Sequence, residues 1–298
     1  MRIVSLVPHA TELLFALGLG EQVVGVTHEC DHPTEATALP HVTRDVLPSG
    51  LSAAEIDREV KERTQRGEAI YALDERAVRA LEPDLIVTQE LCPVCAVSYD
   101  EVASLAKRLP TCPKVVALDP KTFGETLGDA RTIAQLTGTR DAAVELVKRT
   151  RARVDAVRRT LREAGRPPVL VAALEWFDPV FVAGHWTPQL IEYAGGIDVL
   201  GLPGEHSPQV MWEDVNAAAP EVIVAMPCGF DSQTAYREAE LHTDELRRTG
   251  ARRVVAVDGG AYFSRPGPRL VEGLELLAHV LHPDLFGAPP ADALELEL

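Results

Sequence analysis

Cysteine and histidine side chains gather in two short segments, each placed directly after an apolar run. LCPVC follows DLIVTQE and holds two thiols, while THECDHP follows VVGV and holds a thiol between two imidazoles at alternate positions. In an extended loop, side chains two residues apart point the same way, so those three can converge. Three thiols and two imidazoles are ample for a tetrahedral zinc site or an iron–sulfur centre. The predicted metal ligands are His28, Cys30, His32, Cys92 and Cys95.

Other chemistries fit the same thiols. A reversible dithiol–disulfide has the right spacing, but a thioredoxin-like pair should open a helix within a βαβ pattern, and this pair follows a strand. Direct contact of a thiolate or imidazole with a bound ligand is a third hypothesis. Packing of the cysteines as small hydrophobic side chains is a fourth. The residue types and their spacing leave all four hypotheses open.

The elements that must position these groups follow from short apolar runs that alternate with helical patterns. Near-continuous apolar strands separated by helices are typical of α/β folds with parallel sheets. The sequence therefore predicts an α/β protein with mainly parallel sheets flanked by helices. The predicted strands are IVSLV (3–7), VVGVT (23–27), DLIVT (84–88), KVVAL (114–118), VLVAAL (169–174), EVIVAM (221–226) and RVVAV (253–257).

A weak internal repeat divides the chain into two lobes. TELLFALGLG is echoed by TPQLIEYAGG, RALEPDLIVTQ by NAAAPEVIVAM, and KVVALD by RVVAVD, in the same order in both halves. Two related lobes are therefore predicted at 1–120 and 167–298. Between them, 121–166 has helical periodicity broken only around Gly138. Its one-sided apolar stripe predicts a long connecting helix that packs along both lobes.

Composition limits the class of partner. The chain has 298 residues, of which 46% are apolar, and a formal net charge of −16, which disfavours nucleic acid and anionic membranes. No apolar stretch approaches the length of a membrane span. The segment MRIVSLVPHATELLFALGLG predicts a strand and a helix rather than a signal peptide, and no nearby cysteine accepts a lipid. We therefore expect a cytoplasmic monomer with free thiols and a solvated C-terminal run, ELEL.

Three segments carry a resemblance to a known family: IVSLVPHATELLFALGLGEQVVGVTHECDHP, ALEPDLIVTQ and YFSRPGPRL. They resemble the helical-backbone (class III) periplasmic-binding-protein-like family, most closely the cobalamin-binding substrate-binding proteins of ABC importers. The first two segments are similar to the opening strands and helix of the first lobe. The third resembles a second-lobe segment that borders the corrinoid. The resemblance implies two lobes, each with a mainly parallel sheet, joined by one long helix, with the ligand cleft between the lobes.

The same resemblance implies which residues contact the ligand, which would be cobalamin. They lie in loops at the carboxyl ends of strands, where open parallel sheets generally bind ligands. Aromatic rings there suit a large flat macrocycle, because stacking and apolar burial supply most of its affinity. The family's cleft tryptophans correspond here to Gln89 and, roughly, Ser207. The expected contacts are Pro8, His9, Glu29, Gln89, Trp176, Phe177, Trp186, Ser207, Tyr262, Phe263 and Arg265.

Two functions follow from these patterns. The first is binding of a cobalamin-like corrinoid by a cytoplasmic carrier, buffer or sensor, or by a substrate-binding protein of an ABC importer. In the importer case, the resemblance implies that Glu213 and Glu90 meet the permease. The alternative is a thiolate–metal redox or corrinoid-processing enzyme that uses zinc or an iron–sulfur cluster. The sequence has no nucleophile elbow, phosphate loop or dinucleotide fingerprint, which favours binding over catalysis.

Overall fold

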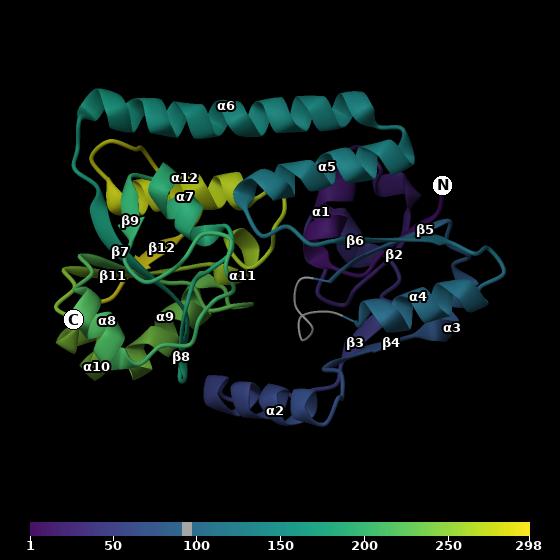
Figure 1. Cartoon of the computed structure of the whole chain (residues 1–298), viewed down its shortest axis with the longest axis horizontal. Coiled ribbons are helices and arrows are strands. Elements are labelled where there is room, and N and C mark those ends of the chain that lie inside the picture. Colours follow the sequence, from purple (N-terminus) through teal and green to yellow (C-terminus); the bar gives the residue numbers. More distant parts are fainter. Residues whose placement is uncertain (91–96) are drawn as a thin grey trace. The chain divides into compact units, whose positions relative to one another are not determined.

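The computed structural model describes residues 1–90 and 97–298 (Figure 1). The chain divides into two compact units. Unit 1 comprises Met1–Pro120 and Leu127–Val147, and unit 2 comprises Lys121–Thr126 and Lys148–Leu298. Each unit has helices packed on a mainly parallel sheet, so the α/β fold class predicted from the sequence is confirmed.

The sheet of unit 1 contains β1 (Ile3–Ser5), β2 (Val23–Val26), β5 (Leu85–Gln89) and β6 (Lys114–Leu118). These four strands are parallel and lie in the order β2-β1-β5-β6. Successive side chains alternate between two cores: Ile3 and Leu85 join one apolar cluster, whereas Val4 and Ile86 join the other. Both faces of the sheet are buried, which explains why the strands are apolar at consecutive positions.

Helices supply both cores of unit 1. One cluster includes side chains of α1 (Pro8–Ala16), α5 (Phe123–Thr137) and the start of α6 (Arg140–Ala164). The other includes α3 (Glu75–Ala80) and α4 (Tyr99–Arg108). Short 3-10 turns, η1 (Gly20–Gln22) and η2 (Thr34–Ala38), flank β2. The sheet is thus a central layer between helices.

A two-stranded antiparallel ribbon adds to unit 1. It pairs β3 (Thr43–Asp45) with β4 (Tyr71–Leu73). Between these strands the chain forms α2 (Ala53–Gln65), which begins at a capping box of Ser52 and Glu55. The sequence patterns do not predict this ribbon, because each strand is only three residues long and has no extended apolar run.

The sheet of unit 2 is built on β7 (Val169–Phe177), β10 (Val222–Ala225) and β11 (Arg253–Val257), which are adjacent and parallel. β9 (Gly196–Asp198) is parallel to β7, whereas β8 (Val180–Val182) and β12 (Ala293–Glu295) are antiparallel additions. The expectation of a solvated C-terminal run holds only in part, because Glu295, Glu297 and Leu298 are exposed but the run is not a free end. Glu295 lies in β12 and Leu296 is buried, because this segment closes the edge of the sheet beside β11.

The segment between the two sheets contains two helices, α5 and α6. The break predicted around Gly138 is present, and Gly138 has φ +76°, a left-handed conformation that ends α5. α6 is the long helix, with 25 residues. Its later part lies beside α12 (Leu270–Leu281) in Figure 1, and Arg153 forms a two-pronged ion pair with Glu275 there at 2.8 and 2.6 Å.

The remaining helices of unit 2 are short. Among the described residues, no helix is both long and apolar enough to cross a membrane. The unit 2 helices not yet named are α7 (Thr187–Tyr193), α8 (Trp212–Ala218), α9 (Ser232–Leu241), α10 (Thr243–Arg248) and α11 (Gly259–Tyr262).

Candidate functional site

The carboxyl ends of β7, β10 and β11 lie at one edge of the unit 2 sheet, because the strands are adjacent and parallel. The indole of Trp176 contacts the ring of Phe230, with ring centres 5.4 Å apart and planes inclined by 51°. A backbone hydrogen bond joins the end of β7 to the loop after β10, because the N–H of Cys228 donates to the carbonyl of Glu175 at 3.2 Å. We call Glu175, Trp176, Cys228, Phe230 and Tyr262 the unit 2 rim.

Two glycines bring the loop after β11 close to the loop after β10. A Cβ atom on Gly259 would lie 2.4 Å from the carbonyl oxygen of Pro227, so only glycine fits there without a backbone shift. The N–H of Gly260 donates to the carbonyl of Phe230 at 3.1 Å. This close approach fixes α11 and therefore places Tyr262, its last residue, beside the other strand ends.

Tyr262 combines an aromatic face with nearby charge. Its side chain is half-buried, and the guanidinium of Arg269 lies 5.6 Å from the ring centre, within the range of a cation–π contact. Burial raises the pKa of the Tyr262 phenol, so the group stays a neutral hydrogen-bond donor. Arg265 is half-buried in the same loop. The rim, together with Arg265 and Arg269 in the loop after Tyr262, thus offers rings, one phenol and two guanidinium groups to a ligand.

Glu175, the residue before Trp176, brings an ionisable carboxyl group to the same end of β7. Burial raises the pKa of Glu175 to about 7, a hydrogen bond from Ser207 opposes that rise, and the charge of Asp198 adds to it. The hydroxyl of Ser207 also accepts from the N–H of Gly184 at 3.2 Å. Burial likewise raises the pKa of Asp198, whose Oδ1 atom accepts from two backbone N–H groups. Ser207, a predicted contact, is therefore joined to the rim through Glu175.

Three other predicted aromatic contacts are placed in the interior of unit 2. Phe177 is 1% exposed and stacks on His242, with ring centres 5.2 Å apart. Trp186 is 4% exposed and donates from Nε1 to the carbonyl of Phe263 at 2.7 Å, and Phe263 is itself 1% exposed. Packing and this hydrogen bond account for all three side chains. A role in ligand contact stays a prediction for them.

In unit 1, the carboxyl ends of β1, β2 and β5 carry the predicted first-lobe contacts. Pro8 and His9 are the first residues of α1, and His9 is buried. Gln89 is the last residue of β5 and is also buried, whereas Glu90 is exposed. Glu29 is half-buried and accepts from the Tyr71 hydroxyl at 2.9 Å. These residues lie at neighbouring strand ends, as expected.

The segment THECDHP differs from the extended loop that the sequence predicts. The N–H of Cys30 donates to the carbonyl of Thr27 at 3.1 Å, so the chain turns between them. The imidazole of His28 packs against Tyr71, whereas the Cys30 sulfur lies 3.0 Å from the Thr11 hydroxyl in the core. His32 is exposed. The expected convergence of these three side chains is therefore corrected, because side chains two residues apart point the same way in an extended strand but not in a turn.

The structure describes only three of the five predicted metal ligands, His28, Cys30 and His32. Cys92 and Cys95 lie outside the described residues. Among residues 1–90 and 97–298, no three His, Cys, Asp or Glu side chains form a group that could hold a metal ion. Buried Cys30 and the Thr43-bound imidazole of His28 have polar partners of their own. The assignment of zinc or an iron–sulfur cluster therefore gains no support and stays a prediction.

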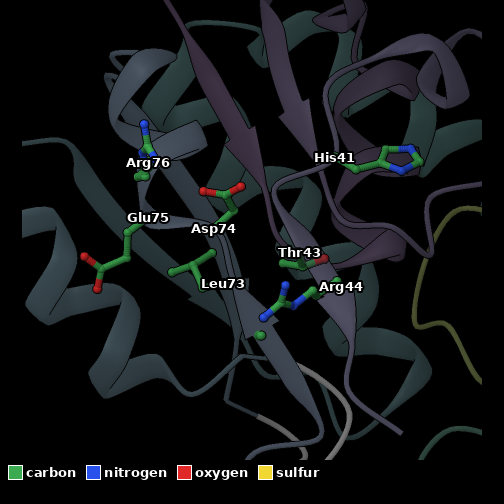
Figure 2. A pocket seen from close by; sticks show the side chains of 8 residues that line it. His41, Thr43, Arg44, Leu73, Asp74, Glu75 and Arg76 are labelled. Carbon is green, nitrogen blue, oxygen red and sulfur yellow. The ribbon is translucent and has the colours of Figure 1, made fainter. Parts of the chain in front are cut away.

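A pocket of about 360 Å³ lies beside the β3–β4 ribbon. Figure 2 shows Thr43, Leu73 and Asp74 around it, with Arg44 and Arg76 toward different sides. Asp74 is the N-cap residue of α3, and its Oδ1 atom accepts from the N–H of Ala77 at 2.9 Å. The sequence patterns miss this pocket because they miss the ribbon that forms it.

Comparisons with known proteins cover nearly the whole chain. Residues 3–252 match the family model described as periplasmic binding protein. A vitamin B12-binding protein of Vibrio cholerae is 23% identical over 276 residues, which span 92% of this chain and 86% of that protein. The uncharacterized ABC transporter substrate-binding lipoprotein YvrC of Bacillus subtilis is 26% identical over 292 residues, spanning 96% of this chain and 81% of the relative.

Solved structures support the same fold. The periplasmic heme-binding protein BhuT in complex with two hemes has a TM-score of 0.70 at 23% identity, covering 95% of this chain and 98% of that one. The periplasmic vitamin B12-binding protein BtuF of Vibrio cholerae has a TM-score of 0.66 at 21% identity, covering 95% and 96%. At such identities the likeness shows the fold alone.

The cytoplasmic location expected from the sequence is wrong. The relatives and structural neighbours include a lipoprotein of an ABC transporter and periplasmic binding proteins. The expectation rested on residues 1–20, and these form β1, α1 and the turn after them. That segment is part of the folded core of unit 1, so its composition reports on packing and carries no information about location.

Proposed function

Because the chain belongs to the periplasmic binding protein family, we propose that it is the substrate-binding protein of an ABC importer and that its ligand is a cobalamin-like corrinoid. Curated relatives named vitamin B12-binding protein align with 92% of the chain, which supports this ligand class. Binding requires no chemical step. The thiolate–metal enzyme alternative gains no support from the relatives or from the described residues.

The unit 2 rim is the observation that carries the proposal. A corrinoid presents a broad apolar face edged by amide groups, and its nucleotide loop carries a phosphate. The Trp176–Phe230 pair and Tyr262 offer faces for stacking and apolar burial. Arg265 and Arg269 offer donors to amide oxygens or phosphate. This combination of rings and guanidinium groups suits a macrocycle with polar edges better than a small polar ligand.

The partner of such a protein is a membrane permease. We propose that Glu213 and Glu90 take part in docking, since both are exposed and each can pair with a basic group. Glu213 lies in the first turn of α8 in unit 2, and Glu90 directly follows β5 in unit 1. Charge-reversal variants, Glu213→Lys and Glu90→Lys, should weaken capture by the permease in reconstituted vesicles while leaving corrinoid affinity unchanged.

Titration of the purified full chain with hydroxocobalamin tests the ligand. Binding should give calorimetric heat and a change in the visible spectrum of the corrinoid. Trp176→Ala and Tyr262→Ala should each weaken affinity about tenfold, which corresponds to roughly 1.4 kcal/mol, a typical value for one aromatic contact. Circular dichroism of each variant checks that the fold persists.

Tyr193→Ala is the matched control. Tyr193 is half-buried and has the guanidinium of Arg158 at 5.1 Å, much as Tyr262 has Arg269, but it lies just before β9, whose Gly196 pairs with Val169 at the amino end of β7. Its removal should leave affinity unchanged. If hydroxocobalamin gives no heat and no spectral change, the corrinoid proposal is wrong. Stoichiometric binding of haemin in its place would reassign the ligand to haem.

A further inference from the structure

Two histidines of unit 2 lie in direct contact. The Nε2 atom of His185 is 3.2 Å from the Nδ1 atom of His206, and their rings are nearly perpendicular, at 87°, with centres 5.0 Å apart. His185 follows β8, and His206 belongs to the loop that connects β9 to α8. His206 is exposed and His185 half-buried, so the pair is open to solvent. Neither residue belongs to the unit 2 rim.

The backbone holds the two loops together closely. The N–H of His185 donates to the carbonyl of Glu205 at 2.6 Å, and the N–H of Gly204 donates to the carbonyl of His185 at 2.8 Å. A Cβ atom on Gly184 would lie 2.5 Å from that same Glu205 oxygen and 2.7 Å from the nitrogen of Ser207, so the approach depends on glycine. The imidazoles are therefore presented by a fixed frame.

The conformation of His185 adds to this picture. Its φ is +51°, in the left-handed region that non-glycine residues rarely adopt. Strained residues of this kind concentrate at functional sites, where the surrounding structure holds them in place.

The nitrogen separation matches that of two imidazoles on one metal ion. Imidazole nitrogens bind zinc at about 2.0–2.1 Å, so two of them at an angle of about 90–109° lie about 2.8–3.4 Å apart. The observed 3.2 Å falls inside this range. It also fits a hydrogen bond between neutral imidazoles, in which one ring donates and the other accepts. A metal ion would lie off the line between the two nitrogens, so the rings would keep this separation and turn until both lone pairs point at the ion.

We propose that His185 and His206 bind one divalent metal ion of the zinc class, with its other positions filled by water or by a donor atom of a bound ligand. Imidazole favours zinc, nickel and copper over magnesium. The chain's net charge of −16 favours a cation, and the exposed residue before His206, Glu205, adds a negative charge to the same loop. In the described part of the chain no third protein ligand joins the pair, which leaves the site open on one side.

Zinc titration of the full chain tests this proposal, and it does not rest on the corrinoid. The thiols are first alkylated with iodoacetamide so that cysteines do not compete. Competition with a chromophoric chelator should then reveal one zinc site, with no binding of Mg²⁺. His206→Ala and His185→Asn should each weaken zinc binding at least tenfold, roughly the smallest loss seen when even an outer-shell partner of a metal is removed. Asparagine is chosen at 185 because it tolerates a left-handed backbone.

His41→Ala is the control, since His41 is an exposed histidine of unit 1. It should leave zinc affinity unchanged. The melting temperature should rise with zinc in the wild type and in His41→Ala, and rise clearly less in the two other variants. The proposal is wrong if the alkylated wild type binds no zinc, or if the alkylated His206→Ala variant binds zinc as tightly as the wild type. In that case the pair only forms a hydrogen bond between two loops. Hydroxocobalamin titration in the presence of a chelator reports separately on the corrinoid.

Discussion

The carboxyl group of Glu175 accepts a hydrogen bond from the hydroxyl of Ser207, and this contact joins the end of β7 to the loop after β9. Ser207 in turn accepts from the N–H of Gly184, so three separate segments meet at one hydroxyl. Asp198 is close enough to add its charge. Folding thus places an ionisable group where water is scarce and a like charge is near.

This environment predicts a pH dependence of stability. Burial raises the pKa of Glu175 from 4.5 to about 7, so the folded state binds the proton more tightly than the unfolded state. Below about pH 4.5 the group is protonated in both states and has no effect. As pH rises from there to about 7, the unfolded state ionises first, and the stability falls by on the order of 3 kcal/mol.

Glu175→Gln should remove that loss. The amide is neutral at every pH and can still accept from Ser207, so above pH 7 the variant should be more stable than the wild type. Urea unfolding followed by circular dichroism between pH 4.5 and 8.5 measures the difference. Glu240→Gln, at an exposed position on α9, should follow the wild-type curve. Parallel curves for Glu175→Gln and the wild type would show that Glu175 is not the group responsible.

Gly184→Ala should destabilise unit 2. The added Cβ atom would meet backbone atoms of Glu205, His206 and Ser207 at 2.5–2.8 Å, and backbone cannot move aside cheaply. We expect a loss of about 1–3 kcal/mol in the free energy of unfolding, the usual cost of overpacking. Gly287→Ala is the control, since a Cβ atom there has no neighbour within 4 Å among the described residues. Equal stability of the two variants would contradict the close approach.

The ion pair between Arg153 and Glu275 should contribute modestly. Its two hydrogen bonds, of 2.8 and 2.6 Å, join α6 to α12, but the side chains are 38% and 30% exposed. A double-mutant cycle with Arg153→Gln and Glu275→Gln should give a coupling energy of about 0.5–1 kcal/mol that declines in high salt. The exposed pair Arg247–Asp244, at 3.8 Å, should show almost no coupling. Equal coupling for both pairs would contradict this ranking.

Thr43→Val should destabilise unit 1. The Thr43 hydroxyl lies 2.7 Å from the Thr27 hydroxyl, 2.7 Å from Nδ1 of His28 and 3.1 Å from the N–H of His28. Valine leaves these groups without that partner, at a cost of about 1–3 kcal/mol. Urea unfolding measures the loss. Thr37→Val, at an exposed threonine, should change stability by less than about 0.5 kcal/mol, and a similar loss in both variants would rule out a special role for Thr43.

Much of the fold could be predicted from the chain because buried parallel strands are apolar at every position. All seven predicted apolar runs contain strands of the two sheets. The β3–β4 ribbon was not predicted from the sequence, because its strands are short and mixed in polarity. The C-terminal strand escaped because ELEL resembles a solvated tail until β11 pairs with it. Local composition cannot show a pairing that depends on a partner far away in the sequence.

The candidate site was harder to predict than the fold. Trp176 and Phe177 are adjacent in β7, so their side chains point to opposite faces of the sheet. Trp176 reaches Phe230 at the rim, whereas Phe177 stacks on His242 in the core. The sequence places two aromatic residues at the end of a strand, but it does not show which face of the sheet is covered by other elements. The contact between His185 and His206 also had no local signal, because α7 and β9 lie between them in the chain.

The sequence by itself determined the α/β class, the strands of both sheets, the break at Gly138 and the family, because apolar periodicity and short motifs are local properties. Only the tertiary structure decided which aromatic rings reach the rim, that THEC turns instead of extending, and that two histidines from different loops meet. These outcomes depend on strand order and on backbone contacts between distant segments, such as Gly184 against Glu205. Side chains far apart in the chain become neighbours only when the sheet that carries them has formed.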